Sequence, residues 1–237
     1  MSSDFPRMPQ RIHAYIRAKR RRSDYDESAQ SPTTKEYPRM PHIALSVCRD
    51  IDISLSSALT NRKSYRECVP GALIPLDDIS TILGNSLRET AVNRRPYPSG
   101  GAKYPIETYL IARGIDSLPR GVFHYAPKNH SLEHLWDIPA ETRIFGGSAK
   151  DGWAEHAPVI VVFTALWERS YVKYGDFSYL LTCLEAGHMA QNILLTAGTL
   201  GIGACPMAGF NDSAVGALLD IDSSREQAVH SVILCAR

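Results

Sequence analysis

The sequence predicts an α+β fold in which helices flank a mostly antiparallel central sheet. Residues 159–163 form a continuous apolar, largely β-branched run after Pro158, which is typical of a buried central strand. Residues 176–200 carry apolar side chains at helical spacing, which indicates one long helix. The other helix and strand patterns follow one another without a regular βαβ alternation, and this disfavours a parallel sheet.

The long helix has recognisable ends. Asp176 is expected to cap its N-terminus, and Gly201 is expected to stop it at the C-terminus. Gly187 lies in its middle, where glycine costs about 1 kcal/mol relative to alanine. This cost predicts that Gly187 packs closely against another helix or a cofactor.

Shorter helices are predicted at 53–61 and 212–219. A further helix opens at Pro75, because a proline followed by two aspartates suits the first turn of a helix. Gly84 is expected to end it.

The remaining strands are short. Residues 106–112 alternate in the manner of a strand, and residues 229–236 predict a final strand. Residues 121–125 and 132–136 are separated by a turn-forming segment, so we expect them to form a hairpin.

The composition excludes several classes of protein. Hydrophobic residues make up 44% of the chain, which is enough for one sizeable core. Lys and Arg number 26 against 25 Asp and Glu, so no overall field favours nucleic acid. No apolar run approaches the roughly 20 residues of a membrane helix, and no apolar signal segment begins the chain. We therefore expect neither a nucleic-acid nor a membrane partner, and a cytoplasmic location.

The cysteines are five in number and widely scattered: Cys48, Cys68, Cys183, Cys205 and Cys235. They show no spacing typical of metal ligands. We therefore expect neither a metal site nor a disulfide framework.

The N-terminal region differs from the rest in composition. Residues 1–42 are expected to form a basic and polar arm, and residues 43–237 the compact domain. Arg17 and residues 19–22 form a basic cluster, followed by a polar stretch that extends to residue 35. The cluster is either a solvated surface or a contact surface for a partner protein or an acidic peptide.

The segment 94–105 is the strongest local signal in the chain. Pro98 restricts the backbone, while Gly100 and Gly101 lack Cβ atoms and allow it to lie against a flat group. Ser99 adds a hydroxyl and a free backbone N–H. The segment predicts either a tight turn or a loop that holds a planar cofactor.

Two further segments suggest ligand contacts. Arg62, Ser64 and Arg66 project to one side if the backbone is extended, as a phosphate or polyol clamp or as a solvated surface strand. Gly201 and Gly203 follow the long helix. They either let the backbone approach a ligand or stop the helix before a turn.

Lys173 and Tyr174 precede the long helix. Either is a candidate general base if burial or a cationic neighbour lowers its pKa; the alternative is a surface lysine beside a packed tyrosine. His188 shares a helix face with Glu185 and Gln191, where a hydrogen-bonded structural role is more typical of histidine.

Taken in order along residues 50–237, these motifs resemble the SagB/McbC-type flavin dehydrogenases of the nitroreductase superfamily. The resemblance is carried by 62–66, 94–109, 121–125, 173–174, 184–192 and 201–210. It implies a nitroreductase-like fold, with 43–237 as an FMN-binding domain and FMN at the interface of an intertwined homodimer.

The resemblance also implies roles for single residues. Arg62, Ser64 and Arg66 would hold the FMN phosphate and ribityl chain, and Pro98, Ser99, Gly100 and Gly101 would lie against the isoalloxazine ring. Gln191, Gly201 and Gly203 would line the other side, and the C-terminal Arg237 would reach the phosphate. Lys173 and Tyr174 match the family's catalytic pair, and no metal is implied.

The function implied is that of an FMN-dependent azoline oxidase in microcin-type antibiotic biosynthesis. It would convert thiazolines or oxazolines in a ribosomally made precursor peptide to thiazoles or oxazoles, with dioxygen as acceptor. Its partners would be a YcaO-type cyclodehydratase and a precursor-peptide-binding subunit. The alternatives are an NAD(P)H-dependent nitro or quinone reductase, another peptide dehydrogenase, or a flavin-free scaffold subunit.

Overall fold

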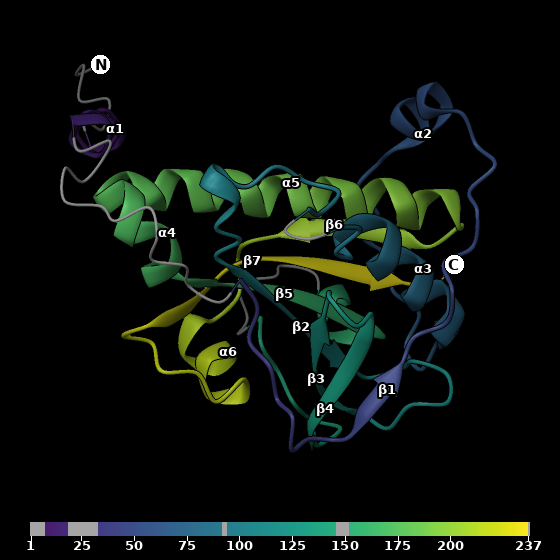
Figure 1. Cartoon of the computed structure of the whole chain (residues 1–237). Coiled ribbons are helices and arrows are strands. Elements are labelled where there is room, and N and C mark those ends of the chain that lie inside the picture. Colours follow the sequence, from purple (N-terminus) through teal and green to yellow (C-terminus); the bar gives the residue numbers. More distant parts are fainter. Residues whose placement is uncertain (1–7, 19–32, 92–93, 146–151, 237) are drawn as a thin grey trace, which may run out of the picture.

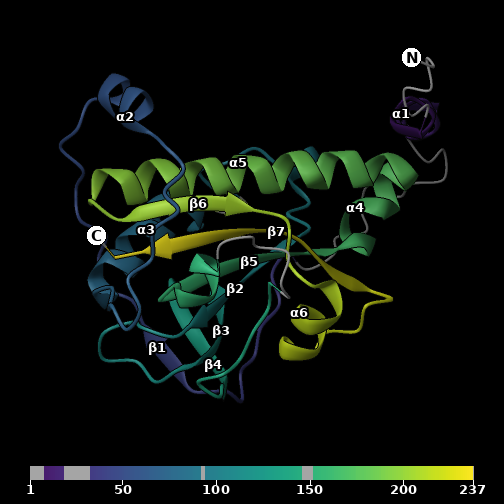
Figure 2. The ribbon, with the colours of Figure 1, turned by 180° about the vertical axis from the view of Figure 1, so that it is seen from behind.

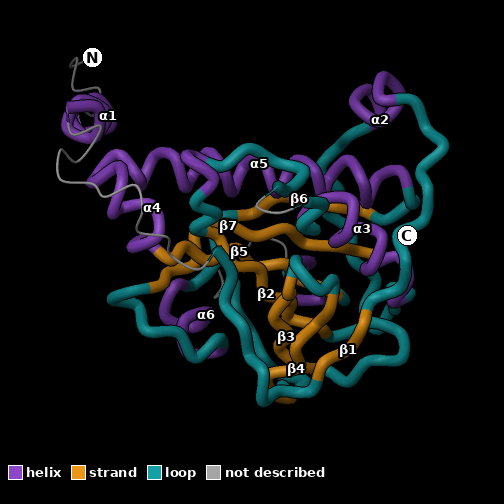
Figure 3. The backbone as a smooth tube through the Cα atoms, viewed as in Figure 1, coloured by secondary structure: helices purple, strands orange, loops and turns teal. Residues whose placement is uncertain are grey.

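The computed structural model describes residues 8–18, 33–91, 94–145 and 152–236. Within them, seven strands form one sheet in the order β1-β4-β3-β2-β5-β7-β6, and every pair of neighbouring strands is antiparallel. Helices lie above and below this sheet (Figures 1 and 3). The predicted α+β architecture with an antiparallel central sheet is confirmed.

The strands have the following bounds: β1 (His42–Ala44), β2 (Ile106–Ala112), β3 (Gly121–Ala126), β4 (Ser131–Asp137), β5 (Val159–Leu166), β6 (Gly203–Met207) and β7 (Glu226–Cys235). The helices are α1 (Met8–Ala18), α2 (Leu55–Asn61), α3 (Leu76–Leu87), α4 (Trp167–Tyr174), α5 (Ser178–Thr199) and α6 (Asp212–Leu218). Short 3₁₀ turns occur at Gly100–Ala102, Trp153–His156 and Gly175–Phe177.

Each face of the sheet has its own apolar core. On one face, side chains of β2, β5 and β7 pack against α3 and α5. On the other face, the alternate side chains of the same strands pack against α6, the 3₁₀ turn Trp153–His156 and residues 37–40. Strand β5 lies between β2 and β7 and is buried on both faces, which confirms the predicted central strand.

Several predicted helix boundaries are wrong. Helix α3 continues through Gly84 to Leu87, and Gly84 lies inside it because the sulfur of Cys48 occupies the space that a Cβ would need. Asp176 does not cap α5 but lies in the 3₁₀ turn before it, whereas Gly201 follows its end with a φ of 76°, as predicted. A Cβ built at Gly187 has no neighbour within 4 Å beyond the adjacent backbone of α5, so the expected close packing is not found among the described residues.

Helix α5 ends at a turn that holds Gly201, as one of the two alternatives predicted, and Gly203 then begins strand β6, which pairs with β7. One sequence expectation fails for a tertiary reason. Cys68 and Cys235, 167 residues apart, form a disulfide with Cα atoms 4.9 Å apart. The expectation of no disulfide was wrong, because the fold brings the segment after α2 to the end of β7.

The chain joins the sheet well before residue 43. The backbone N–H of Lys35 donates to Glu107 of β2 at 2.7 Å, and that of Tyr37 donates to Glu133 of β4 at 3.0 Å. The Lys35 ammonium pairs with Glu226 of β7 at 2.7 Å. Residues 35–37 therefore contact side chains of three strands, β4, β2 and β7, on the face opposite α5. Residues 19–22 of the predicted basic cluster lie outside the described residues.

A buried charge network lies beneath this segment. His124 of β3 is fully buried between two carboxylates, with Glu107 at 2.8 Å and Glu133 at 2.6 Å. Arg169 of α4 pairs with the other oxygen of Glu107 at 2.5 Å.

The members of the network stabilise one another's charged forms. Burial alone would raise the pKa of Glu107, but hydrogen bonding and charge from His124 and the charge of Arg169 outweigh it and lower the pKa to about 2. Burial alone would lower the pKa of His124, but Glu107 and Glu133 raise it above its ordinary value. The network therefore consists of charges that are buried and paired.

Replacement of His124 by alanine is expected to destabilise the fold strongly. The change leaves two buried carboxylates without their partner, which costs about 3–5 kcal/mol. His42→Ala is the matched control: His42 lies 3.8 Å from the same Glu133, but its side chain is 41% exposed, so a loss of about 0–1 kcal/mol is expected. Urea denaturation measures both, and equal losses would contradict this account.

Candidate active site

The predicted clamp residues lie on an extended segment between α2 and α3. The backbone N–H of Tyr65 donates to the carbonyl of Ala204 in β6 at 2.9 Å, which holds this segment against the sheet edge. Figure 2 shows it crossing the end of α5 beside β6. Tyr65 packs inward over Gly203, while Ser64 and Arg66 are exposed. The three predicted clamp residues are not brought to one pocket: Arg62 is half-buried and lines a pocket that neither Ser64 nor Arg66 lines.

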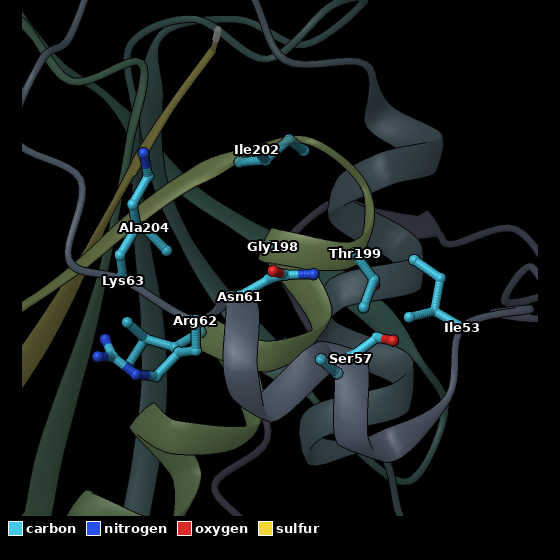
Figure 4. A pocket seen from close by; sticks show the side chains of 11 residues that line it. Ile53, Ser57, Asn61, Arg62, Lys63, Gly198, Thr199, Ile202 and Ala204 are labelled. Atoms are coloured by element: carbon cyan, nitrogen blue, oxygen red, sulfur yellow. The ribbon is translucent and has the colours of Figure 1, made fainter.

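Arg62 lines a small pocket of about 110 Å³ at the end of α5. Lys63 lines it as well, together with polar side chains of α2 and α5. Figure 4 shows the Arg62 and Lys63 side chains leaving the backbone in different directions around this pocket. Two cations beside a small, partly polar pocket suit an oxyanion such as a phosphate. Lys63 was not among the predicted clamp residues, although its position between them was a signal.

The Pro98–Gly101 loop lies near the other end of α5. Gly101 has a φ of 61°, and a Cβ built there would lie 2.8 Å from the Tyr174 hydroxyl and 3.4 Å from the Lys173 Nζ. A Cβ at Gly100 would lie 3.1 Å from Leu181 of α5. The structure thus brings the glycine loop and the Lys173–Tyr174 pair together, and the positive φ of Gly101 favours glycine at that position.

The Lys173–Tyr174 pair ends α4. The Lys173 Nζ lies 5.7 Å from the centroid of the Tyr174 ring, and both side chains are partly exposed. Arg169, one turn earlier on α4, donates to the carbonyl of Tyr104 at 3.1 Å and so holds the helix against the end of the glycine loop. The pair is therefore anchored but accessible, as a general base or acid must be.

The remaining predicted residues are dispersed. Gln191 is exposed on the outer face of α5, and Gly201 has no described atom within 4 Å of its Cβ position. Arg237 lies outside the described residues. Residues 208 and 210, which follow β6, line a larger pocket of about 660 Å³ with Trp167, Tyr179 and α6. This pocket was not predicted.

Within one chain, the loop and the clamp do not meet. The loop contacts α5 at Leu181, whereas Leu194 and Gly198 line the Arg62 pocket. Leu194 lies thirteen residues after Leu181 on the helix, a distance of about 20 Å along its axis. The loop and the clamp are thus held apart by the length of α5.

Glu185 was singled out in the sequence only as a neighbour of His188, but it lies at the loop. It is 2% exposed, and its Oε1 has no hydrogen-bond partner among the described residues. Burial raises the pKa of Glu185 to about 7, although the nearby Ser99 hydroxyl and the charges of Arg95 and Arg169 oppose this. A carboxyl that titrates near neutral pH is typical of functional sites.

The described residues contain no group of three or more His, Cys, Asp and Glu side chains that could hold a metal ion. They also contain no helix long and apolar enough to span a membrane.

Comparison with known proteins places these features in a family. The nitroreductase family matches residues 59–235. The chain is 31% identical over 171 residues to the nitroreductase-type protein MJ1384 of Methanocaldococcus jannaschii, covering 72% of this chain and 86% of that protein. It is 32% identical over 136 residues to the microcin B17-processing protein McbC of Escherichia coli, covering 54% of this chain. The chain spans 49% of McbC, about half its length.

Solved structures of related proteins share the fold of this chain. A chain of the E. coli microcin synthetase McbBCD complex, solved with truncated pro-MccB17 bound, aligns with a TM-score of 0.62 and 26% identity. The alignment covers 86% of this chain and 78% of that one. A nitroreductase-type protein of Desulfovibrio desulfuricans, solved in complex with FMN, aligns with a TM-score of 0.54 and 18% identity over 78% of this chain and 86% of that one. The second likeness concerns the fold alone.

Glu185→Gln is expected to remove a pH dependence of stability. Because the pKa of Glu185 rises from 4.5 to about 7 on folding, the folded chain keeps a proton that the unfolded chain releases in this range. The free energy of unfolding of the natural protein therefore falls by about 3 kcal/mol as pH rises through this window. Urea denaturation at pH 5 and pH 8 should show this fall reduced by that amount in the variant. If the free energy of unfolding fell equally with pH in the natural protein and in Glu185→Gln, the raised pKa would not belong to Glu185.

Proposed function

The chain belongs to the nitroreductase family, and from this premise we propose that it is an FMN-dependent azoline dehydrogenase acting on a ribosomally made precursor peptide. The observation that carries the proposal is the contact of the Ser99–Gly101 loop with Lys173 and Tyr174. A surface for a flat ring and a pair of acid–base side chains are the two requirements for removing a hydride and a proton from one substrate. The likeness to McbC supports a peptide as that substrate.

The chemical character of the residues at the candidate site suits FMN. Arg62 and Lys63 offer a cationic pocket to its phosphate, and Gly100 and Gly101 present backbone without side chains to its ring. When bound, FMN would accept the hydride from the azoline ring and pass its electrons to dioxygen. Lys173 or Tyr174 would take the ring proton, and Arg169 would hold the helix that carries them.

A homodimer would complete the site. The outer face of α5 carries Leu184, Gly187, His188, Gln191 and Gly198, all exposed. No described atom lies within 4 Å of a Cβ built at Gly187 or Gly198, so a second helix can approach closely there. Antiparallel packing of α5 on its copy, about a two-fold axis, would bring the loop of one chain toward the Arg62 pocket of the other. Gly187 would then have the close neighbour that its place in the helix predicts.

The remaining partners follow from the substrate. Azoline rings must first be formed from Cys, Ser or Thr residues of the peptide, which requires a cyclodehydratase. We infer that a cyclodehydratase of the YcaO type and a precursor-peptide-binding subunit act with this chain, in the manner of the McbBCD complex.

Arg62→Ala is expected to weaken FMN binding at least tenfold, because a hydrogen bond to a charged group contributes about 1.5–3 kcal/mol. Lys128→Ala, an exposed cation in the β3–β4 turn, is the control and should bind FMN as the natural protein does. Titration of apoprotein with FMN, followed by flavin fluorescence, measures both. Equal affinity in a folded Arg62→Ala protein would reject the phosphate assignment.

Lys173→Ala and Tyr174→Phe should keep FMN but slow azoline oxidation by about 10²–10⁴-fold, the usual contribution of a positioned acid or base. Mass spectrometry of a synthetic azoline peptide follows the reaction, since each oxidation removes two hydrogens, about 2 Da. Tyr171→Phe, on an exposed site of the same helix, is the control. If both variants oxidised the azoline peptide as fast as the natural protein, Lys173 and Tyr174 would have a structural role and no catalytic one. Rapid flavin bleaching by NAD(P)H, with azoline peptides left unoxidised, would favour a nitro or quinone reductase.

A further inference from the structure

The glycine loop ends in a backbone conformation that its residues do not favour. Ala102 and Tyr104, neither of them glycine, have φ values of 52° and 44°. This left-handed region is disfavoured for residues with a Cβ, and such residues keep it only where the surrounding structure holds them there. Contacts around the loop must therefore maintain its shape.

Tyr104, at the end of the loop, is held at three points. Its backbone N–H donates to the Ser99 Oγ at 2.9 Å, and its carbonyl accepts a hydrogen bond from Arg169 at 3.1 Å. Its buried ring faces the Arg95 guanidinium, which lies 4.4 Å from the ring centroid. A cation over an aromatic face is attracted to it, so Arg95 fixes the ring while the other two contacts fix the backbone.

Arg95 joins both flanks of the loop to the N-terminal segment. One of its terminal nitrogens donates to the Tyr97 hydroxyl at 3.0 Å, and the other donates to the Thr34 hydroxyl at 2.8 Å and to the Thr33 carbonyl at 3.0 Å. The Tyr97 ring meets the Tyr104 ring edge-on, with the centroids 5.9 Å apart. Because the glycine loop lies between these two tyrosines, one guanidinium fixes both the start and the end of the loop.

The same backbone atom of the N-terminal segment also anchors α4. The Thr33 carbonyl accepts a second hydrogen bond, from Arg169, at 3.3 Å. The loop that faces Lys173 and Tyr174 and the helix that carries this pair are thus tied to one point. Loss of the Arg95 side chain would free the loop from this point, while Arg169 would still hold the helix.

We propose that Arg95 is a positioning residue, which holds the glycine loop in the shape that receives the FMN ring. The inference rests on the proposed function, because it assumes that this loop binds FMN. A loop that is ordered before the cofactor arrives loses less conformational freedom on binding, so the affinity is higher. The fork of the guanidinium reaches Tyr97 on one side and Thr34 on the other, and the single ammonium of a lysine cannot make both contacts.

The test is the affinity of the apoprotein for FMN, together with the visible absorbance spectrum of the bound cofactor. Arg95→Met should weaken FMN binding about tenfold, because the hydrogen bonds from a charged group that order the loop are lost. Arg95→Lys should weaken it by a similar factor. At saturating FMN, the spectrum in Arg95→Met should move toward that of free FMN, because flavin absorbance reports the surroundings of the ring. Arg62→Ala, which acts on the phosphate, should weaken binding without this spectral change.

Thr34→Val is a milder variant, which keeps the test decisive if Arg95→Met fails to fold. It removes one acceptor of the Arg95 guanidinium, so FMN binding should weaken about threefold. In the Arg95→Met background the same change should have no further effect, because both changes remove the same contact. Arg94→Met is the matched control: Arg94 is the preceding residue and is exposed, so this variant should bind FMN as the natural protein does.

A folded Arg95→Met protein with either natural FMN affinity or an unchanged flavin spectrum would overturn the inference and leave the proposed function standing. Natural affinity in Arg95→Lys or in Thr34→Val would do the same. Failure of the natural protein to bind FMN would overturn both. If FMN binding responds to Arg95 as expected but azoline peptides are left unoxidised, the inference is supported and only the proposed dehydrogenase activity is overturned.

Discussion

The candidate site depends on one side chain, Arg169. Its guanidinium pairs with Glu107 of β2 at 2.5 Å and donates to the Tyr104 carbonyl at 3.1 Å, so it joins α4, the sheet and the end of the glycine loop. Lys173 and Tyr174 follow it by about one turn on the same helix. Glu107 is itself held by the buried His124, so the placement of the proposed catalytic pair depends on a charge network inside the sheet.

The two kinds of buried charge in this protein serve different ends. The carboxylates around His124 are paired on every side, and burial of such a network is tolerated because each charge has its partner. Glu185 is buried with its Oε1 unpartnered among the described residues, and burial raises its pKa to about 7. The first arrangement holds the sheet and the N-terminal segment rigid. The second leaves a group at the loop whose charge changes within the physiological range of pH.

Helix α5 acts as a spacer between the two halves of the site. Its inner face packs on the sheet, one end contacts the glycine loop, and the other end lines the Arg62 pocket. A straight helix cannot be shortened, so about 20 Å separates the two halves in each chain. The outer face of α5 is exposed and carries glycines that leave room for another helix. In the proposed dimer, a second chain would pack there and bring its own half of the site close to the half from the first chain.

The sequence by itself determined the elements whose signal is local. The alternating run 106–112 and the apolar run at 159–163 became β2 and β5, and Gly201 stopped α5, because side-chain periodicity and backbone preference act over a few residues. Only the tertiary structure decided what depends on distant segments: the pairing of Cys68 with Cys235, and the burial of Glu185. It also decided that loop and clamp lie at opposite ends of α5, because packing on the sheet, and no local pattern, sets which parts of the chain meet.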